Sequence, residues 1–141
     1  MLEACLQQLD LHKLRRTKNR ETVLIVLHGA QGPLSPPAIV SACHTLGRQA
    51  NKTTIYRELD LLERVGLIKR VMVSDRKQYF ELTERGHHHH LVCIGCEGVE
   101  DITLGEHGFE RQIKALARVK QFAVLRHSLE IFGWCKTCHQ L

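Results

Sequence analysis

The chain has 141 residues, of which 43% are hydrophobic and 25% charged, and its formal net charge is +5. These proportions are typical of a globular protein, and no apolar run approaches the roughly 20 residues that a membrane-spanning helix needs. In the first residues the basic side chains follow the apolar ones, which does not fit a secretory signal. We therefore expect a cytoplasmic protein without a membrane segment.

Charge is distributed unevenly along the sequence. Residues 1–86 carry fourteen Lys and Arg against nine Asp and Glu, whereas residues 87–141 carry six of each. Both C-x-x-C pairs lie in the second half. The asymmetry predicts two domains, a basic one at residues 1–84 that faces a polyanion and a metal-binding one at residues 85–141. The alternative is a solvated basic face, which a net charge of +5 alone would favour.

Two helices are predicted first in the basic half. An apolar stripe predicts a helix over residues 17–28 with Thr17 as its N-cap. Pro36 and Pro37, directly after Ser35, suit the first turn of a second helix that ends near Gly47. We expect these helices to bury Val23, Leu24, Leu27, Ile39, Val40 and Leu46.

A third helix and a hairpin complete this half. Asn51 is a good N-cap and Gly66 a natural stop, and the helix between them has one apolar face made of Ile55, Leu59 and Leu62. Residues 67–73 and 78–82 alternate like two strands joined by a basic turn. Three helices followed by a hairpin predict a winged helix-turn-helix.

In such a domain the third helix enters the major groove of DNA. Its polar face would then carry the contacts to DNA, namely Lys52, Thr53, Thr54, Tyr56 and Arg57. Basic residues outside this helix would meet phosphates or the minor groove: Arg15, Arg16, Lys18, Arg20, Arg76 and Lys77. The alternative is an ordinary helical domain whose exposed face is polar.

The cysteines predict a metal site in the second half. Cys93 and Cys96 form one C-x-x-C pair, and Cys135 and Cys138 form another after about 38 intervening residues. Two such pairs complete a tetrahedral S₄ site with no open position, which is typical of structural zinc. The alternative is four reduced cysteines in a core. Two further cysteines, Cys5 and Cys43, are expected to be core or surface thiols.

Four consecutive histidines, His87 to His90, precede the first C-x-x-C pair. In an extended segment over residues 86–94 their side chains alternate between two faces, so one strand would supply two separate sites. Candidate partners are Glu81 and Asp101 for His88 and His90. For His87 and His89 the candidates are Glu110 and His127, the latter on the last strand. Mixed imidazole and carboxylate ligands suit zinc, iron(II), manganese or nickel.

Three segments together resemble the ferric uptake regulator family of bacterial metal-sensing repressors: TTIYRELDLLERVGLIKR, YFELTERGHHHHLVCIGC and RHSLEIFGWCKTC. The resemblance covers residues 11–138. It implies an α+β fold, with an N-terminal winged helix-turn-helix domain and a C-terminal α/β dimerisation domain that holds a Cys₄ zinc site. It also implies a homodimer that binds palindromic double-stranded operators when loaded with metal.

The resemblance also implies roles for individual residues. Tyr56 and Arg57 match the contacts of the recognition helix, and Arg15 matches a minor-groove contact. The structural Zn²⁺ ligands would be Cys93, Cys96, Cys135 and Cys138. The regulatory site, for Fe²⁺ or Zn²⁺ with Mn²⁺ as a substitute in vitro, would be Glu81, His88, His90 and Asp101. A second site, inside the dimerisation domain, would be His87, His89, Glu110 and His127.

The chain departs from the family pattern at three places. Many members have a histidine ligand in the loop before the third helix of the pattern, but residues 32–34 offer no donor side chain, which favours four-coordinate zinc or a site completed by water. His89 stands where many iron sensors have an aspartate. Glu97 stands where a glycine usually follows the first C-x-x-C pair.

The sequence thus predicts a metal-dependent repressor that controls iron or zinc homeostasis genes, with no small-molecule substrate and no enzymatic activity. A peroxide- or other-metal-sensing member of the family is the first alternative. A metal buffer that does not bind DNA is the second, and a zinc hydrolase is the third, although no H-E-x-x-H helix is present. The sequence leaves open whether dimers pair into tetramers.

Overall fold

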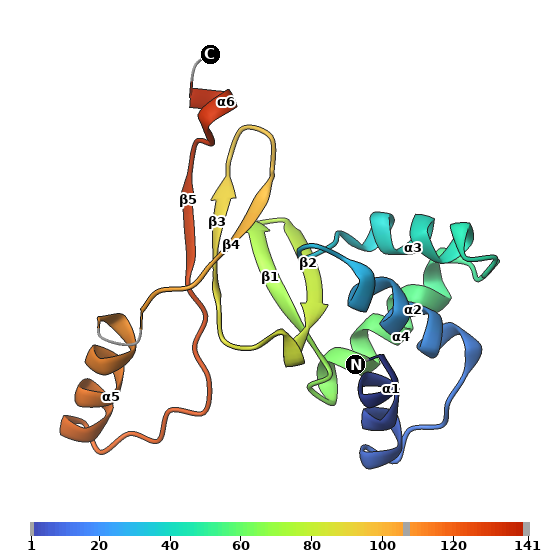
Figure 1. Ribbon diagram of the computed structural model, residues 1–141, viewed down its shortest axis with the longest axis horizontal. Coiled ribbons are helices and arrows are strands. Elements are labelled where there is room, and N and C mark those ends of the chain that lie inside the picture. The colour runs from blue at the N-terminus through green and yellow to red at the C-terminus, as the bar shows by residue number, and fades with distance from the viewer. Residues whose placement is uncertain (1, 106–107, 140–141) are drawn as a thin grey trace. The chain divides into compact units, whose positions relative to one another are not determined.

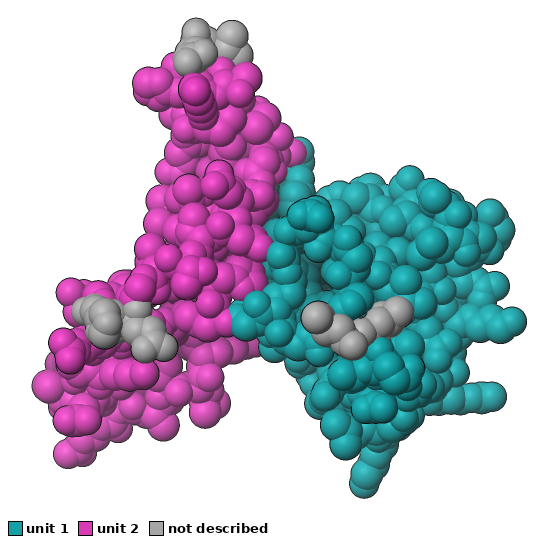
Figure 2. All heavy atoms as spheres, viewed as in Figure 1, with its two compact units in different colours: residues 1–86 teal, residues 87–141 magenta. Residues whose placement is uncertain are grey.

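The computed structural model describes residues 2–105 and 108–139. The chain divides into two compact units, unit 1 at Met1–Gly86 and unit 2 at His87–Leu141 (Figure 2). Helices and small, separate sheets give it an α+β fold. No helix among the described residues is both long and apolar enough to cross a membrane.

Unit 1 begins with four helices (Figure 1): α1 Leu2–Leu11, α2 Lys18–Gly29, α3 Pro36–Thr45 and α4 Lys52–Arg64. The sequence had predicted only the last three of them. Helix α1 buries Cys5 and Leu9, which lie four residues apart on one face, in the core of the unit. The winged helix-turn-helix therefore carries an additional N-terminal helix.

Side chains cap the three predicted helices, two of them at the predicted caps Thr17 and Asn51 and the other at Ser35. Each cap oxygen accepts a hydrogen bond from the backbone N–H three residues further on, which satisfies a donor that the first turn leaves without a helical partner. The bonds are Arg20 N to Thr17 Oγ1 at 3.3 Å, Ala38 N to Ser35 Oγ at 3.3 Å and Thr54 N to Asn51 Oδ1 at 2.8 Å. The helix starts are thus confirmed.

The wing is an antiparallel hairpin of β1 Ile68–Ser74 and β2 Lys77–Leu82, followed by the 3₁₀ turn η1 Thr83–Arg85. The segment before α3 adds to its edge, because Leu34 and Phe80 exchange two backbone hydrogen bonds of 2.9 and 2.8 Å. This bridge ties the hairpin to the helical part of unit 1.

The core of unit 1 is one apolar cluster that draws on α1 to α4 and on both wing strands. It contains Val23, Leu24, Leu27, Ile39, Ile55, Leu59 and Leu62, as predicted, with Val40 partly buried against it. Leu46 was predicted to be buried but is 57% exposed, because α3 ends before it and Leu46 is the C-cap. Cys5 and Cys43 are core thiols, and burial raises the pKa of Cys5 to about 12 and also raises the pKa of Cys43.

Unit 2 contains β3 His89–Cys93, β4 Val99–Ile102, α5 Phe109–Val119, β5 Glu130–Gly133 and α6 Lys136–His139. Its strands form one sheet in the order β4-β3-β5, with β3 antiparallel to β4 and parallel to β5. The extended segment predicted for residues 86–94 is thus a shorter strand that begins at the third histidine.

Unit 2 buries little apolar surface within the chain. Among its described residues, only Val92 and Cys93 are buried hydrophobic residues, and α5 has none. Large apolar side chains remain exposed instead, including Leu116, Val119, Phe122, Leu125, Phe132 and Trp134. A three-stranded sheet with so small a core needs other sources of stability.

Replacing Asn51 by Ala should lower the free energy of unfolding by about 1 kcal/mol, because the Thr54 N–H then loses its acceptor. Denaturant unfolding followed by circular dichroism would measure the change. Asn51→Ser keeps a capping oxygen and should retain most of the stability. Equal losses in the two variants would show that the cap contributes nothing.

Candidate metal centres and nucleic-acid interface

Four cysteines converge at one end of the sheet in unit 2. Cys93 ends β3 and Cys96 lies in the turn that follows, while Cys135 directly precedes α6 and Cys138 lies within it. The four Sγ atoms all lie within 4.8 Å of one another, and those of Cys96 and Cys135 are 3.8 Å apart. Four thiols without a fifth donor are the ligand set of a structural zinc site.

Hydrogen bonds prepare one of these thiols for ionisation. The Cys135 N–H donates to Cys93 Sγ at 3.3 Å and, with the Cys96 N–H, lowers the pKa of Cys93 to about 6. The neighbouring sulfurs of Cys135 and Cys93 instead raise the pKa of Cys138 to about 12. The cluster therefore resists full ionisation unless a cation is bound, and Zn²⁺ fits because it deprotonates the thiols that coordinate it.

Two residues of the first cysteine turn have roles that spacing alone did not reveal. A Cβ atom added to Gly95 would lie 3.0 Å from Cys138 Sγ and 3.0 Å from the Trp134 ring, so only glycine fits there without displacement. Glu97 has φ = 59°, the left-handed conformation that glycine adopts without strain. The resemblance implies a glycine at this position, and the positive φ explains why glycine suits it better than Glu97.

Gly95→Ala should weaken zinc retention, because the added methyl group pushes against the Cys138 side chain at a cost of about 1–3 kcal/mol. Release of zinc to a chromophoric chelator would measure the effect. Gly105→Ala is the matched control in unit 2, since nothing lies within 4 Å of its added Cβ. Zinc release at the same rate from all three proteins would contradict the close contact.

A second cluster brings together His87, His89, Glu110 and His127, whose donor atoms all lie within 4.8 Å of one another. Glu110 Oε1 is 2.5 Å from His87 Nε2 and 3.1 Å from His127 Nε2. Glu110 belongs to the first turn of α5. His127 was predicted to lie on the last strand, but it lies before β5, in the segment that joins α5 to that strand.

His89 is the most deeply buried member of this cluster, at 2% exposed. Among the described residues, neither of its ring nitrogens has a hydrogen-bond partner. Burial, followed by the nearby His87 and His127, lowers its pKa, so His89 is held as neutral imidazole. A buried polar atom without a partner is costly, and a neutral imidazole is the form that binds metal, so three histidines and a carboxylate fit a divalent cation.

The lowered pKa of His89 predicts a pH dependence of stability in the absence of metal at this cluster. Because the folded state binds the proton more weakly than the unfolded state, the stability present above the ordinary pKa of 6.5 is lost as pH falls below it. The free energy of unfolding should fall by up to about 1.4 kcal/mol per pH unit from this group.

Guanidinium unfolding at pH 7.5 and 5.5 would test this, with zinc kept on the cysteines. His89→Gln should lose part of the decrease, whereas His12→Gln, at an exposed helix end, should keep it. An unchanged decrease in His89→Gln would refute the assignment.

The third predicted set includes three residues of unit 2. The rings of His88 and His90 have centroids 4.9 Å apart, and His90 Nε2 lies 3.7 Å from Asp101 Oδ1 on β4. The fourth member, Glu81, belongs to β2 of unit 1, where Lys69 Nζ lies 3.1 Å from one carboxylate oxygen and Arg85 donates to the other at 3.0 Å. The complete set stays a prediction.

The predicted DNA-binding face lies on α4 and on the segment before α2. Lys52, Thr53 and Arg57 are exposed, and Lys52 Nζ lies 5.3 Å from the ring centroid of the half-buried Tyr56. Thr54 is partly engaged, since its hydroxyl donates to Asn51 Oδ1 at 3.0 Å. Outside α4, Arg15 is exposed in the segment between α1 and α2.

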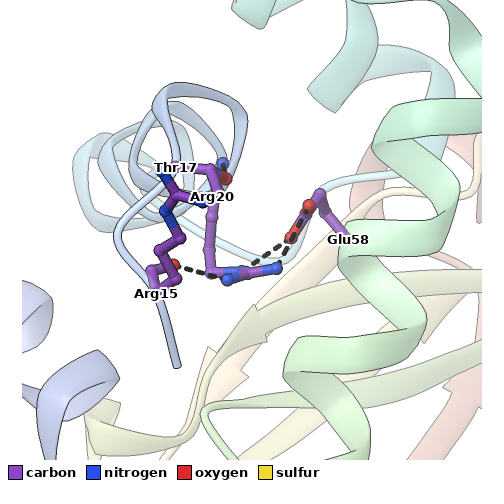
Figure 3. Close-up of polar contacts among 4 residues, drawn as sticks. All are labelled: Arg15, Thr17, Arg20 and Glu58. Carbon is purple, nitrogen blue, oxygen red and sulfur yellow. Dashed lines mark hydrogen bonds and ion pairs between the residues drawn. The ribbon is translucent and has the colours of Figure 1, made fainter. Parts of the chain in front are cut away.

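Arg20 is the exception among the predicted DNA contacts. It is only 8% exposed, and its guanidinium group donates to the Glu58 carboxylate on α4 and to the Arg15 carbonyl oxygen (Figure 3). Three hydrogen bonds inside unit 1 do not fit a direct phosphate contact. The helical pattern placed Arg20 on α2 but gave no indication of its partner, which lies 38 residues away in sequence.

The chain is similar to known proteins in both sequence and fold. Residues 12–132 match the Ferric uptake regulator family. The chain is 34% identical over 133 residues to the ferric uptake regulation protein of Legionella pneumophila, covering 94% of this chain and 96% of that protein.

Two solved structures extend the comparison. The Helicobacter pylori ferric uptake regulator, described as having three functional metal-binding sites, shares 25% identity over 99% of this chain and 94% of its own, with a TM-score of 0.83. The Pseudomonas aeruginosa ferric uptake regulator, solved with manganese, shares 26% identity over 92% of this chain and 96% of its own, with a TM-score of 0.80.

Proposed function

Because the chain belongs to the ferric uptake regulator family, we propose that it is a metal-responsive transcriptional repressor in the cytoplasm. It binds a palindromic double-stranded operator as a homodimer and controls genes of metal homeostasis. Members of this family are transcription regulators and not enzymes, and the closed ligand set of the cysteine cluster supports a structural role for that site.

One observation carries the proposal. A single chain combines a winged helix-turn-helix, whose α4 exposes Lys52, Thr53 and Arg57, with a second unit in which histidines, carboxylates and cysteines form separate donor clusters. A metal buffer has no use for an exposed basic face on a capped helix. A hydrolase needs a metal with an open position beside a general base, and no such pair was found in the sequence.

The exposed apolar surface of unit 2 supports the homodimer. Phe122, Leu125 and Trp134 are all more than half exposed, and α5 buries no residue against the rest of the chain. Large apolar side chains exposed in this number are typical of a protein that buries them against a partner. In a two-fold dimer the same surface of each copy would cover that of the other.

The proposed regulation is a shift between conformations of the two domains. A divalent cation would be coordinated by Glu81, His88, His90 and Asp101. This set of ligands is taken from the resemblance to the family. Domain orientation then sets the spacing of the two α4 helices in the dimer, which must match successive major grooves. Reversing a 1:99 equilibrium requires a preference of about 5.5 kcal/mol for the bound form.

Iron(II) is the first candidate for the regulatory metal, because the Legionella relative, at 34% identity, is a ferric uptake regulation protein. Zinc is the second candidate, favoured by the residue types in the chain. Residues 32–34 offer no donor, which leaves a set of two imidazoles and two carboxylates that suits a four-coordinate ion. Manganese is expected to substitute in vitro.

The proposal is tested by an operator-binding titration at fixed salt. The operator is first selected from a random duplex pool with metal-loaded protein, and zinc is kept only on the cysteines before Fe(II), under anaerobic conditions, or Zn(II) is added at buffered free concentrations. We expect affinity to rise by at least about a hundredfold on metal addition. The metal that acts at its physiological free concentration is the regulator.

Replacing His88 and His90 by Ala should abolish the response to metal while leaving the far-ultraviolet circular dichroism unchanged. His12→Ala, outside every donor cluster, is the matched control. Persistent metal-dependent binding in the double variant would reject the regulatory ligand set. Failure of the wild-type protein to select any duplex would reject the function.

A further inference from the structure

Arg20 connects three segments of unit 1 (Figure 3). Its Nε donates to Glu58 Oε2 at 2.8 Å and its Nη2 donates to Glu58 Oε1 at 3.3 Å, which forms a two-pronged bridge from α2 to α4. Its Nη1 donates to the backbone carbonyl oxygen of Arg15 at 2.5 Å. The third segment is therefore the one that joins α1 to α2.

This bridge is shielded from water. The side chains of Arg20 and Glu58 are 10% and 15% exposed, whereas those of Arg16 and Asp10, a surface pair in the same region, are 33% and 61% exposed. A buried two-pronged bridge is less screened by salt and more restricted in geometry than a surface pair. It can hold one position of α4 relative to the start of α2.

The bridge ends on Arg15, a residue of the proposed DNA interface, and on Glu58, the neighbour of Arg57. Glu58 directly follows Arg57, one of the exposed residues of α4. Arg15 is exposed but lies outside any helix, in a segment whose other end is held by the hydrogen bond from Leu14 N to Leu9 O at 2.8 Å. The Arg15 carbonyl is thus fixed by the same guanidinium group that fixes α4.

We infer that Arg20 is a positioning residue that sets the distance between the Arg15 side chain and the recognition face of α4. The inference rests on the proposed DNA binding and adds a residue to it that touches no DNA. Arg15 and Arg57 would read adjacent grooves, and a contact to two grooves requires a fixed separation. The buried bridge provides that separation before DNA is bound.

A second bridge of the same chemistry offers a control. Arg70 on β1 donates from Nε to Glu63 Oε1 at 2.9 Å, and its Nη2 also bonds Glu63, so α4 is tied to the wing near its C-terminal end. Among the described residues, the side chain of Arg70 donates to Glu63 and Gln78 and not to the segment of Arg15. A variant of Arg70 therefore disturbs the support of α4 while leaving the Arg15 carbonyl bound to Arg20.

The test is a double-mutant cycle on the selected operator with saturating metal. Arg20→Lys keeps the positive charge beside Glu58 but removes the fork that reaches the Arg15 carbonyl. We expect Arg15→Ala and Arg20→Lys each to weaken binding by about tenfold, and the double variant to be little weaker than either, because both remove the same contact. Arg70→Lys combined with Arg15→Ala should show additive losses.

Footprinting separates positioning from a general loss of structure. Arg20→Lys should lose protection in the minor groove at the position that Arg15→Ala also loses, while protection of guanine N7 in the major groove persists. Glu58→Gln should give the same pattern, and circular dichroism should show all variants to be folded.

Additive losses for Arg15→Ala and Arg20→Lys, or retained minor-groove protection in Arg20→Lys, would overturn the inference while leaving the proposed function intact. If the wild-type protein itself binds no operator, the proposed function fails and the inference fails with it.

Discussion

The second unit depends on donor side chains where an ordinary domain depends on an apolar core. Among its described residues the sheet buries Val92 and Cys93 as hydrophobic residues, together with His89 and His90. His89 has no hydrogen-bond partner among the described residues, and a buried histidine of this kind destabilises a fold unless a ligand satisfies it. If the donor clusters bind metal as proposed, the binding energy contributes to the folding energy of this unit.

Unit 1 has the opposite character. Its helices and hairpin share one continuous apolar cluster, and α4 is held by the core on one face and by the Arg20 and Arg70 bridges beside it. Such a unit can keep the same internal structure whether or not metal is bound. In the proposed mechanism the response to metal then comes from movement of whole units and not from refolding of the DNA-binding domain.

Local patterns in the sequence predicted most of unit 1. Helix starts are marked by a cap oxygen or by proline in the first turn, so Thr17, Asn51 and the pair Pro36 and Pro37 could be assigned without knowledge of the fold. Alternation along the extended segment over residues 86–94 likewise predicted that His87 lies beside His89 and His88 beside His90. Helix α1 was not predicted, although Cys5 and Leu9 lie four residues apart on its buried face.

Features that depend on distant parts of the chain could not be predicted in this way. The pairing of Arg20 with Glu58, the close approach of Gly95 to Cys138 and the place of His127 before β5 are set by tertiary packing. For Arg20 the composition suggested a phosphate contact, because the residue is basic and near a predicted DNA-binding face. Its burial against Glu58 and Arg15 depends on the whole fold and could not be predicted from composition.

The alternation of the histidines has a consequence for how this protein can diverge. Neighbouring residues of one short segment are assigned to two sets of donors, so inserting one residue between His90 and Leu91 would move every histidine to the opposite face. Such a length change would exchange the two sets at once and leave Glu110 and Asp101 beside the wrong partners. Relatives that differ in metal preference are therefore expected to differ by substitution within this segment, while its length stays fixed.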